Sequence, residues 1–109
     1  MKLWIDDIRP APEGYLWVKS VNEAKRIIID SEKQSKISRM FDCDFRISLI
    51  DIDHDAGDYA SDGGDYIKLL DWFEETGRNY YPIRIHSANP VGVENMRRII
   101  RKNNFLERL

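Results

Sequence analysis

The sequence predicts an α/β fold in which helices cover a mainly parallel sheet. Four short apolar runs, each about as long as a strand, occur at residues 2–6, 15–19, 45–52 and 81–87. Three further segments carry apolar residues at the spacing of a helix with one buried face. Strands that alternate with helices along a chain are typical of parallel sheets, whose crossover connections are right-handed.

The first half of the chain is expected to contain two strands and one helix. KLWID (2–6) and YLWVK (15–19) are rich in apolar, aromatic and β-branched residues, as strands are. The connection DIRPAPEG contains two prolines and a glycine, so no regular helix is expected there. Fully extended, these residues would span about 26 Å, which is more than the length of a typical strand, about 17–20 Å. This length favours a crossover to a parallel neighbour, and a long hairpin is the alternative.

Ser20 followed by Glu23 is a capping-box pattern, which predicts that a helix begins here. Apolar residues from Val21 to Ile28 recur at helical spacing and give this helix one core face. We expect the helix to end within the polar segment DSEKQSKIS, at 30–38.

The second half repeats the alternation of strand and helix. FRISLIDI (45–52) is apolar almost throughout, as expected for a strand covered on both faces. A polar loop follows, then a helix expected at 65–76 with Gly77 as its C-terminal stop. YPIRIHS (81–87) predicts a fourth strand, and ANPVG begins a last helix. We therefore predict one domain over residues 1–109, with four strands and about three helices.

Length and composition narrow the function classes. The 109 residues are 42% hydrophobic, enough for one core, and no run approaches the roughly 20 apolar residues that cross a membrane. Charged residues make up 33% but the net charge is only −2, which predicts no attraction to anionic membranes and no extended nucleic-acid surface. The single cysteine, Cys43, cannot form an intrachain disulfide, which fits a reducing compartment. Acidic residues follow after only three apolar residues at the N-terminus, so no signal peptide is expected there. We expect a soluble cytoplasmic protein.

Polar side chains gather where three of the predicted strands end. After the first, third and fourth strands these residues are Asp6, Asp7 and Arg9; Asp53, His54 and Asp55; and His86, Ser87 and Asn89. Ligands of such sheets bind outside the carboxyl ends of the strands. We therefore expect one site at this edge, and it would contain both histidines of the chain.

Each of these residues also has an ordinary structural interpretation. The two aspartates after the first strand can cap the strand end, and Arg9 can serve only to neutralise them. His54 can be a solvated loop residue, and His86 can be a core histidine with satisfied hydrogen bonds. Asn89 before a proline is common at the start of a helix, although the same helix start offers free amides to an anion.

The segment LIDIDHDAGD is unusually acidic. Two like charges about 4 Å apart repel by about 1 kcal/mol in water and about 4 kcal/mol near a protein surface. Solvent, basic neighbours or a cation must offset this repulsion. Asp51, Asp53 and Asp55 have the alternating spacing of a calcium loop, but Ala56 stands where its sharp turn needs glycine and Asp62 where it usually has Glu. An EF-hand is therefore not expected.

The segments LWIDDIRPAPEG, SVNEAKRII, DHDAG and HSANPVGVENMRRII together resemble the cyclic-phosphate processing receiver-like domains, small relatives of the two-component receiver domain. The resemblance runs through nearly the whole chain and is weakest at 30–46 and 56–64. It implies a receiver-like (flavodoxin-like) three-layer fold with a sheet in the order 2-1-3-4 and the first helix reduced to a loop. It also implies the processing of cyclic phosphates on nucleotides or RNA ends.

Opening a cyclic phosphodiester requires a base for the incoming water and an acid for the departing alkoxide. Histidine, with a pKa of about 6.5, can take either role. The resemblance and this chemistry assign catalysis to His54, His86, Asp53 and Asp55, phosphate binding to Arg9, Ser87, Asn89 and Gly92, and an optional Mg²⁺ to Asp6, Asp7 and Asp53. The expected partner is a phosphorylated small molecule, a cyclic nucleotide or an RNA end.

One local departure from the family pattern concerns the end of the third strand. Asp51 and Ile52 stand where a serine and a leucine are expected directly before the Asp-His-Asp motif. Which of Asp51 and Asp53 faces the pocket is therefore left open.

Other functions also stay open. A signalling receiver would be phosphorylated on Asp53 or Asp51, with Ser87 as the switch hydroxyl, but the two histidines would then be unexplained. It would also need a fifth strand with a lysine, and the chain is expected to end one helix after the fourth strand. A non-catalytic module would bind a cyclic nucleotide or a protein partner without turnover. A haloacid-dehalogenase-like phosphatase is suggested only by the Asp-x-Asp pattern and needs more strands.

Overall fold

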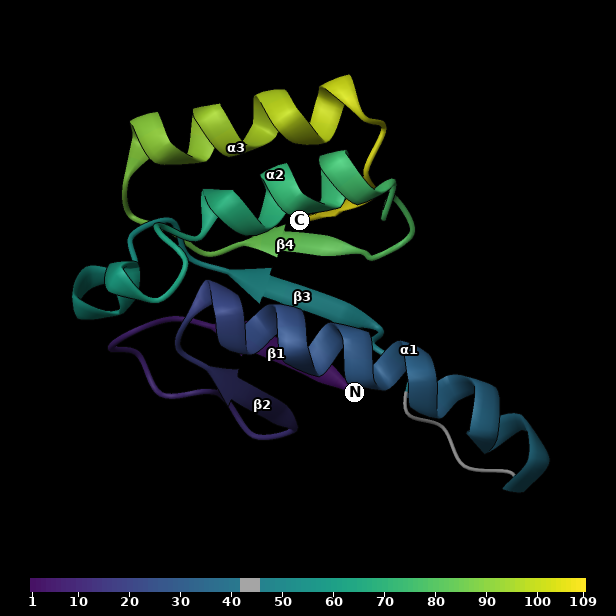
Figure 1. Cartoon of the computed structure of the whole chain (residues 1–109). Helices are drawn as coiled ribbons and strands as arrows, with labels where there is room; N and C mark the ends of the chain where they lie inside the picture. The colour runs from purple at the N-terminus through teal and green to yellow at the C-terminus, as the bar shows by residue number, and fades with distance from the viewer. Residues whose placement is uncertain (42–45) are drawn as a thin grey trace.

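The computed structural model describes residues 1–41 and 46–109, so Cys43 lies outside the described residues. Its strands are β1 (Lys2–Ile5), β2 (Tyr15–Val18), β3 (Leu49–Ile52), β4 (Ile83–Ile85) and β5 (Glu107–Arg108). Its α-helices are α1 (Val21–Phe41), α2 (Ile67–Thr76) and α3 (Pro90–Lys102), and a short 3-10 helix spans Gly57–Ser61. Figure 1 shows the strands side by side with the helices packed along them.

The strands are parallel and lie in the order β2-β1-β3-β4-β5. This confirms the α/β class and the order 2-1-3-4, and it excludes a hairpin between the first two strands. The sheet differs from the prediction by a fifth strand, in which Glu107 pairs with Ile83 and Arg108 with Arg84. Two charged residues carry no apolar strand pattern, so the sequence gives no signal for β5. The strand forms because the open edge of β4 offers backbone hydrogen-bond partners.

All three α-helices lie on one face of the sheet. From β2 to β3, from β3 to β4 and from β4 to β5 the chain moves in the same direction, so right-handed crossovers place α1, α2 and α3 on the same side. α2 packs against both α1 and α3. Six of the strand side chains that point toward the helices are fully buried: Leu3, Ile5, Val18, Ile50, Ile52 and Ile83.

On the opposite face, the loop between β1 and β2 stands where a three-layer fold has helices. The indole Nε1 of Trp4 points to this side and donates to the carbonyl oxygen of Arg9 in that loop at 2.9 Å. The third layer of the predicted three-layer fold is therefore this loop, and no helix of the described residues lies there. This face is discussed further below.

The start of α1 follows the predicted capping box and also fixes the loop after β3. The Ser20 hydroxyl accepts from the Glu23 amide at 3.1 Å, and the Glu23 carboxylate accepts from the Lys19 amide at 3.2 Å. Ser20 Oγ and Asn22 Nδ2 both donate to the carboxylate of Asp62, at 2.6 and 3.0 Å. Asp62 is thus held by the start of α1.

Element boundaries differ from the prediction at several ends. α1 continues to Phe41 instead of ending within 30–38, because Glu, Lys and Gln there are good helix formers even without an apolar face. β3 begins at Leu49, and β4 covers only Ile83–Ile85. Gly77 does end α2, with the positive φ of 69° that favours glycine at this position. None of the helices in the described part of the chain combines the length and apolar character needed to cross a bilayer.

Glu32 joins α1 to the connection between α2 and β4. Arg78 donates to both carboxylate oxygens, at 3.0 and 2.9 Å, and the Tyr80 and Tyr81 hydroxyls donate at 3.0 and 2.6 Å. Burial alone would raise the pKa of Glu32, but these hydrogen bonds hold it below its ordinary value of 4.5. The stabilisation that the carboxylate provides is therefore present above that value and is lost as the pH falls through the lower folded pKa.

Glu32→Gln is expected to lower the free energy of unfolding by about 1–3 kcal/mol at neutral pH, since charged hydrogen bonds are lost and Arg78 keeps no anionic partner. The difference from wild type should shrink as the pH falls below 4.5. Urea denaturation at neutral and acid pH measures both values. Glu75→Gln on the exposed side of α2 is the control and should have little effect at either pH. A difference for Glu32→Gln that grows in acid would contradict the assignment.

Candidate functional site

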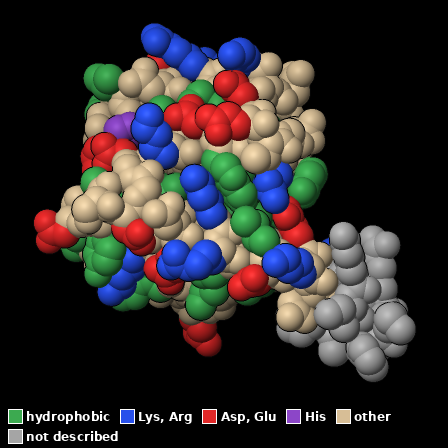
Figure 2. Space-filling model, viewed as in Figure 1, with side chains coloured by type: hydrophobic (Ala, Val, Ile, Leu, Met, Phe, Trp, Pro, Cys, Tyr) green, Lys and Arg blue, Asp and Glu red, His purple; other side chains and the backbone are tan. Residues whose placement is uncertain are grey.

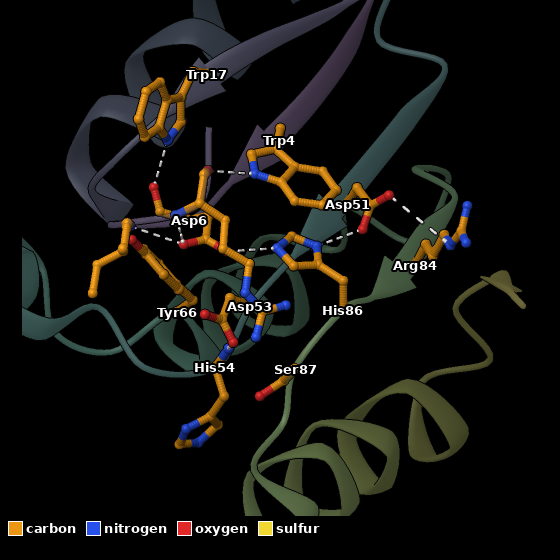
Figure 3. Close-up of polar contacts among 12 residues, drawn as sticks. Trp4, Asp6, Trp17, Asp51, Asp53, His54, Tyr66, Arg84, His86 and Ser87 are labelled. Atoms are coloured by element: carbon orange, nitrogen blue, oxygen red, sulfur yellow. Dashed lines mark hydrogen bonds and ion pairs between the residues drawn. The ribbon is translucent and has the colours of Figure 1, made fainter. Parts of the chain in front are cut away.

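The carboxyl ends of β1, β3 and β4 meet at one edge of the sheet, as the sequence predicts. The ladder continues one residue beyond each strand, because the Asp53 amide donates to the Ile5 carbonyl and the His86 amide to the Ile52 carbonyl, both at 2.9 Å. The Asp6 amide likewise donates to Val18 at 3.1 Å. These side chains therefore leave the sheet at neighbouring positions, and Figure 3 shows them gathered below the indole rings of Trp4 and Trp17.

His86 is held between two buried carboxylates. Its Nδ1 lies 2.6 Å from Asp51 and its Nε2 lies 3.0 Å from Asp6, and these acids are only 2% and 1% exposed. The Trp4 ring stacks on the imidazole at 3.7 Å with an interplanar angle of 5°. Each ring nitrogen of His86 therefore has a carboxylate oxygen within hydrogen-bond distance. Neither nitrogen is open to a substrate here, and the predicted acid–base role of His86 stays a prediction.

Asp6 shapes the start of the loop that carries Arg9. Its Oδ1 accepts from the amides of Ile8 and Arg9, both at 2.9 Å, while its Oδ2 contacts His86. Burial alone would raise the pKa of Asp6, but the hydrogen bonds from these two amides and from His86 hold it below its ordinary value. The Trp17 indole donates to the Asp6 carbonyl at 2.7 Å. Asp6 is therefore ionised and held in one position, and it fixes the start of the loop between β1 and β2.

Asp6, Asp7 and Asp53, for which the sequence predicts an optional Mg²⁺, form an acidic cluster. Each offers one carboxylate oxygen, and these oxygens lie within 4.8 Å of one another. Burial raises the pKa of Asp7, and the negative charges of Asp6 and Asp53 raise it further. Carboxylate oxygens are the ligands that Mg²⁺ prefers, so the donor set fits that ion. Of the two third-strand aspartates, Asp53 joins this cluster and Asp51 contacts His86 Nδ1 instead.

An open pocket of about 320 Å³ adjoins the cluster, lined by Arg9, Asp53, Asp55, Ser87, Ala88 and Asn89. Beside it lies the His54 ring, whose Nδ1 is 2.9 Å from Asp55. The hydrogen bond with His54 lowers the pKa of Asp55, and Asn89, which donates to the other carboxylate oxygen at 3.4 Å, lowers it further. His54 and Asp55 thus form an oriented imidazole–carboxylate pair at the pocket.

Asn89 and Gly92 contact this pair, although the sequence predicts that they bind phosphate. Asn89 is the N-cap of α3, and its Oδ1 accepts from the Gly92 amide at 3.0 Å. A side chain at Gly92 would overlap the His54 ring. The geometry therefore gives both residues a part in positioning His54 and Asp55. Their phosphate-binding role stays a prediction.

Gly92→Ala is expected to displace the His54 ring and break its contact with Asp55, because the added methyl group occupies the space of the imidazole. NMR of the His54 ring protons should show a changed environment, while those of His86 stay as in wild type. Gly14→Ala is a second variant at a glycine, where the added methyl group meets nothing within 4 Å, although a φ of 86° adds backbone strain. Unchanged His54 signals in Gly92→Ala would contradict this packing.

Sequence reasoning missed the parts that Trp4, Trp17 and Tyr66 play. The two indoles anchor the β1–β2 loop and the Asp6 backbone, and the buried Tyr66 hydroxyl donates to the Lys19 carbonyl at 2.8 Å. Burial raises the pKa of Tyr66, as do the nearby acids, so it stays a neutral donor. Because successive side chains of a strand point to opposite faces of the sheet, the sequence did contain a signal for the two indoles. By register, Trp4, Trp17 and Asp51 lie on one face.

Comparison with protein families matches residues 1–102 to the cyclic-phosphate processing receiver domain. The chain belongs to this family. The match spans β1 to the end of α3 and confirms the resemblance drawn from the strand-end motifs. Comparisons of this receiver domain with curated proteins and with solved structures gave no match.

Proposed function

We propose that this receiver domain hydrolyses a cyclic phosphodiester on a nucleotide or an RNA end. The observation that supports it best is one pocket that combines the Arg9 guanidinium and the Ser87 hydroxyl with the oriented His54–Asp55 pair beside them. Such a site offers a cation and a donor for the phosphoryl oxygens and a base for water.

Arg9 and Ser87 are available to bind the phosphoryl group. Arg9 forms no ion pair with any described residue, and two hydrogen bonds to Asp6 fix the turn that presents it. A guanidinium can hold two phosphoryl oxygens at once. The Ser87 Oγ accepts from the Asn89 amide at 3.2 Å, which leaves its own hydrogen free to be donated to the ligand.

His54 would act first as the base and then as the acid. With Nδ1 bonded to Asp55, its Nε2 takes a proton from the attacking water as the new phosphorus–oxygen bond forms. The ring phosphorus–oxygen bond then breaks, and the same proton passes from Nε2 to the departing alkoxide. The product is a phosphate monoester beside a free hydroxyl. His86 would contribute by holding Asp6 in place.

Asp6, Asp7 and Asp53 would hold Mg²⁺ if the reaction uses one. When bound, the ion would polarise the phosphoryl group and offset the repulsion among the three carboxylates. The raised pKa of Asp7 reflects burial and that repulsion. Metal dependence is therefore expected to be seen as stimulation by Mg²⁺ and loss with a chelator.

The test is a screen of 2′,3′-cyclic nucleotides, 3′,5′-cyclic nucleotides and RNA with a cyclic-phosphate end, with and without Mg²⁺. Chromatography would detect the monoester product. Turnover of at least one class is expected. Saturable binding without product under every condition would replace the proposal with a non-catalytic binding module.

A second candidate, phosphorylation on Asp53, is favoured by one observation: Asp53 lies in a cluster with the acidic pair that follows β1. A fifth strand is also present, contrary to expectation, but it consists of Glu107 and Arg108 and has no lysine. Incubation with acetyl phosphate and intact-mass analysis tests it. A stable adduct that Asp53→Asn abolishes, together with no turnover in the screen, would make this the better assignment.

A further inference from the structure

The face of the sheet opposite the helices carries an unusual set of side chains. By register, the residues that point to it are Lys2 and Trp4 of β1, Tyr15 and Trp17 of β2, Leu49 and Asp51 of β3, Arg84 of β4 and Arg108 of β5. Among the described residues, only the β1–β2 loop crosses part of it. We call the surface formed by Lys2, Trp4, Tyr15, Trp17, Arg84 and Arg108 the open sheet face.

The open sheet face is positively charged. Lys2 and Arg108 are exposed, and the Arg84 side chain is 51% exposed. Lys2 and Arg108 form no ion pair with any described residue. The acid that the strands place on this face, Asp51, is 2% exposed and is held by His86. By contrast, Figure 2 shows acidic and basic side chains interspersed over the face that α1 crosses. A net charge of −2 therefore conceals a local cationic surface.

Aromatic rings lie between these cations. Trp4 and Tyr15 pack edge to face with centroids 5.9 Å apart, and Lys2 lies 4.8 Å from the Tyr15 ring. Trp17 has the Lys19 ammonium 4.4 Å from its ring. All three rings are only half-buried. Half-exposed rings beside Lys and Arg are the surface on which single-stranded nucleic acid stacks its bases and places its phosphates.

The open sheet face is continuous with the pocket edge. Trp4 stacks on His86, and the Trp17 indole donates to the Asp6 carbonyl. Figure 3 shows Trp17, Trp4, His86, Asp51 and Arg84 in sequence across the strands, with Ser87 and His54 beyond His86. A chain whose terminal phosphate lies in the pocket can thus continue over the sheet.

We propose that the open sheet face binds the single-stranded RNA segment that precedes a cyclic-phosphate end. The substrate is then an oligonucleotide, and a cyclic mononucleotide fills only the pocket. This assignment of substrate rests on the proposed function. Exposed β-sheets bind RNA in the same way in other folds, with aromatic side chains stacked on the bases.

The main test measures binding of a fluorescent single-stranded RNA with a 2′,3′-cyclic phosphate end by anisotropy. Lys2→Glu/Arg108→Glu should weaken binding by about tenfold or more and reduce its salt dependence. The matched control is Lys33→Glu/Arg98→Glu, two exposed cations on α1 and α3. Each pair changes the net charge by −4, from −2 to −6. The control should bind about as wild type does, because only the position of the charges differs.

Tryptophan fluorescence gives an independent measurement of the contact. Trp72 on α2, beside Lys25 and Arg78, lies away from the open sheet face. In Trp72→Phe the remaining emission comes from Trp4 and Trp17, since the chain has three tryptophans. Single-stranded RNA should quench it, and a duplex of the same sequence should quench it much less.

The outcomes separate this inference from the proposed function. If a cyclic mononucleotide is hydrolysed but both charge-reversed variants bind RNA equally well, the inference that the open sheet face binds RNA is overturned and the proposed function stands. If RNA binds through the open sheet face but no cyclic phosphate is hydrolysed, the proposed function fails and the RNA-binding face is retained. A dimer that Lys2→Glu/Arg108→Glu dissociates, without RNA binding, would assign the surface to a second copy of the chain and overturn the inference.

Discussion

His54→Gln is expected to lower kcat for cyclic-phosphate hydrolysis by about 10²–10⁴-fold, the usual contribution of a positioned acid–base group. Glutamine keeps a polar side chain near Asp55 but cannot take a proton from water. Binding of the phosphate by Arg9 and Ser87 does not depend on the imidazole, so KM should change little. The measurement is steady-state kinetics on the best substrate of the screen, with urea denaturation to show that the fold is retained.

Two further variants make this result specific. Asp55→Asn keeps a hydrogen-bond acceptor for Nδ1 but removes the charge that orients the ring, so its loss of kcat should be smaller than that of His54→Gln. Rescue of His54→Gln by added imidazole would show that the missing group is a base. If His54→Gln retains wild-type kcat, the base lies elsewhere and the proposed mechanism is wrong, even if turnover itself is confirmed.

The meeting of the strand ends could be predicted from sequence because it depends only on fold class. Parallel strands with crossover connections bring their carboxyl ends to one edge, so residues after Ile5, Ile52 and Ile85 had to be neighbours. The pairing of His54 with Asp55 follows from adjacency in the chain. These features needed no knowledge of side-chain packing.

The position of His86 could not be predicted, because it depends on register. Only the pairing of Trp4 with Asp51 across β1 and β3 places an indole and a carboxylate next to the residue that follows β4. A histidine at the end of an apolar strand has the same sequence pattern whether it faces solvent or two acids. The contacts of Asn89 with Asp55 and of Gly92 with His54 could not be predicted for a similar reason, since the start of α3 approaches these residues only in the folded chain.

Asp51→Ala should have the largest effect on stability, about 3–5 kcal/mol, the usual cost of removing one partner from a buried charged pair. His86 would lose its 2.6 Å contact while Trp4 and Asp6 still hold the partly buried ring in place. Asp51→Asn keeps an acceptor for Nδ1 and should cost less. Arg84→Ala removes a half-exposed cation 4.0 Å from the same carboxylate and should cost about 0–1 kcal/mol.

A double-mutant cycle decides whether the cost of Asp51→Ala comes through His86. If it does, adding Asp51→Ala to His86→Gln should cost clearly less than Asp51→Ala alone, because the ring that needs the acid is already gone. Urea denaturation of the four proteins measures the coupling free energy. Additive costs would mean that Asp51 stabilises β3 independently of His86. Coupling would explain why β3 carries a buried aspartate at this position: the buried acid fixes the ring that holds Asp6, and Asp6 in turn fixes the loop that presents Arg9 to the pocket.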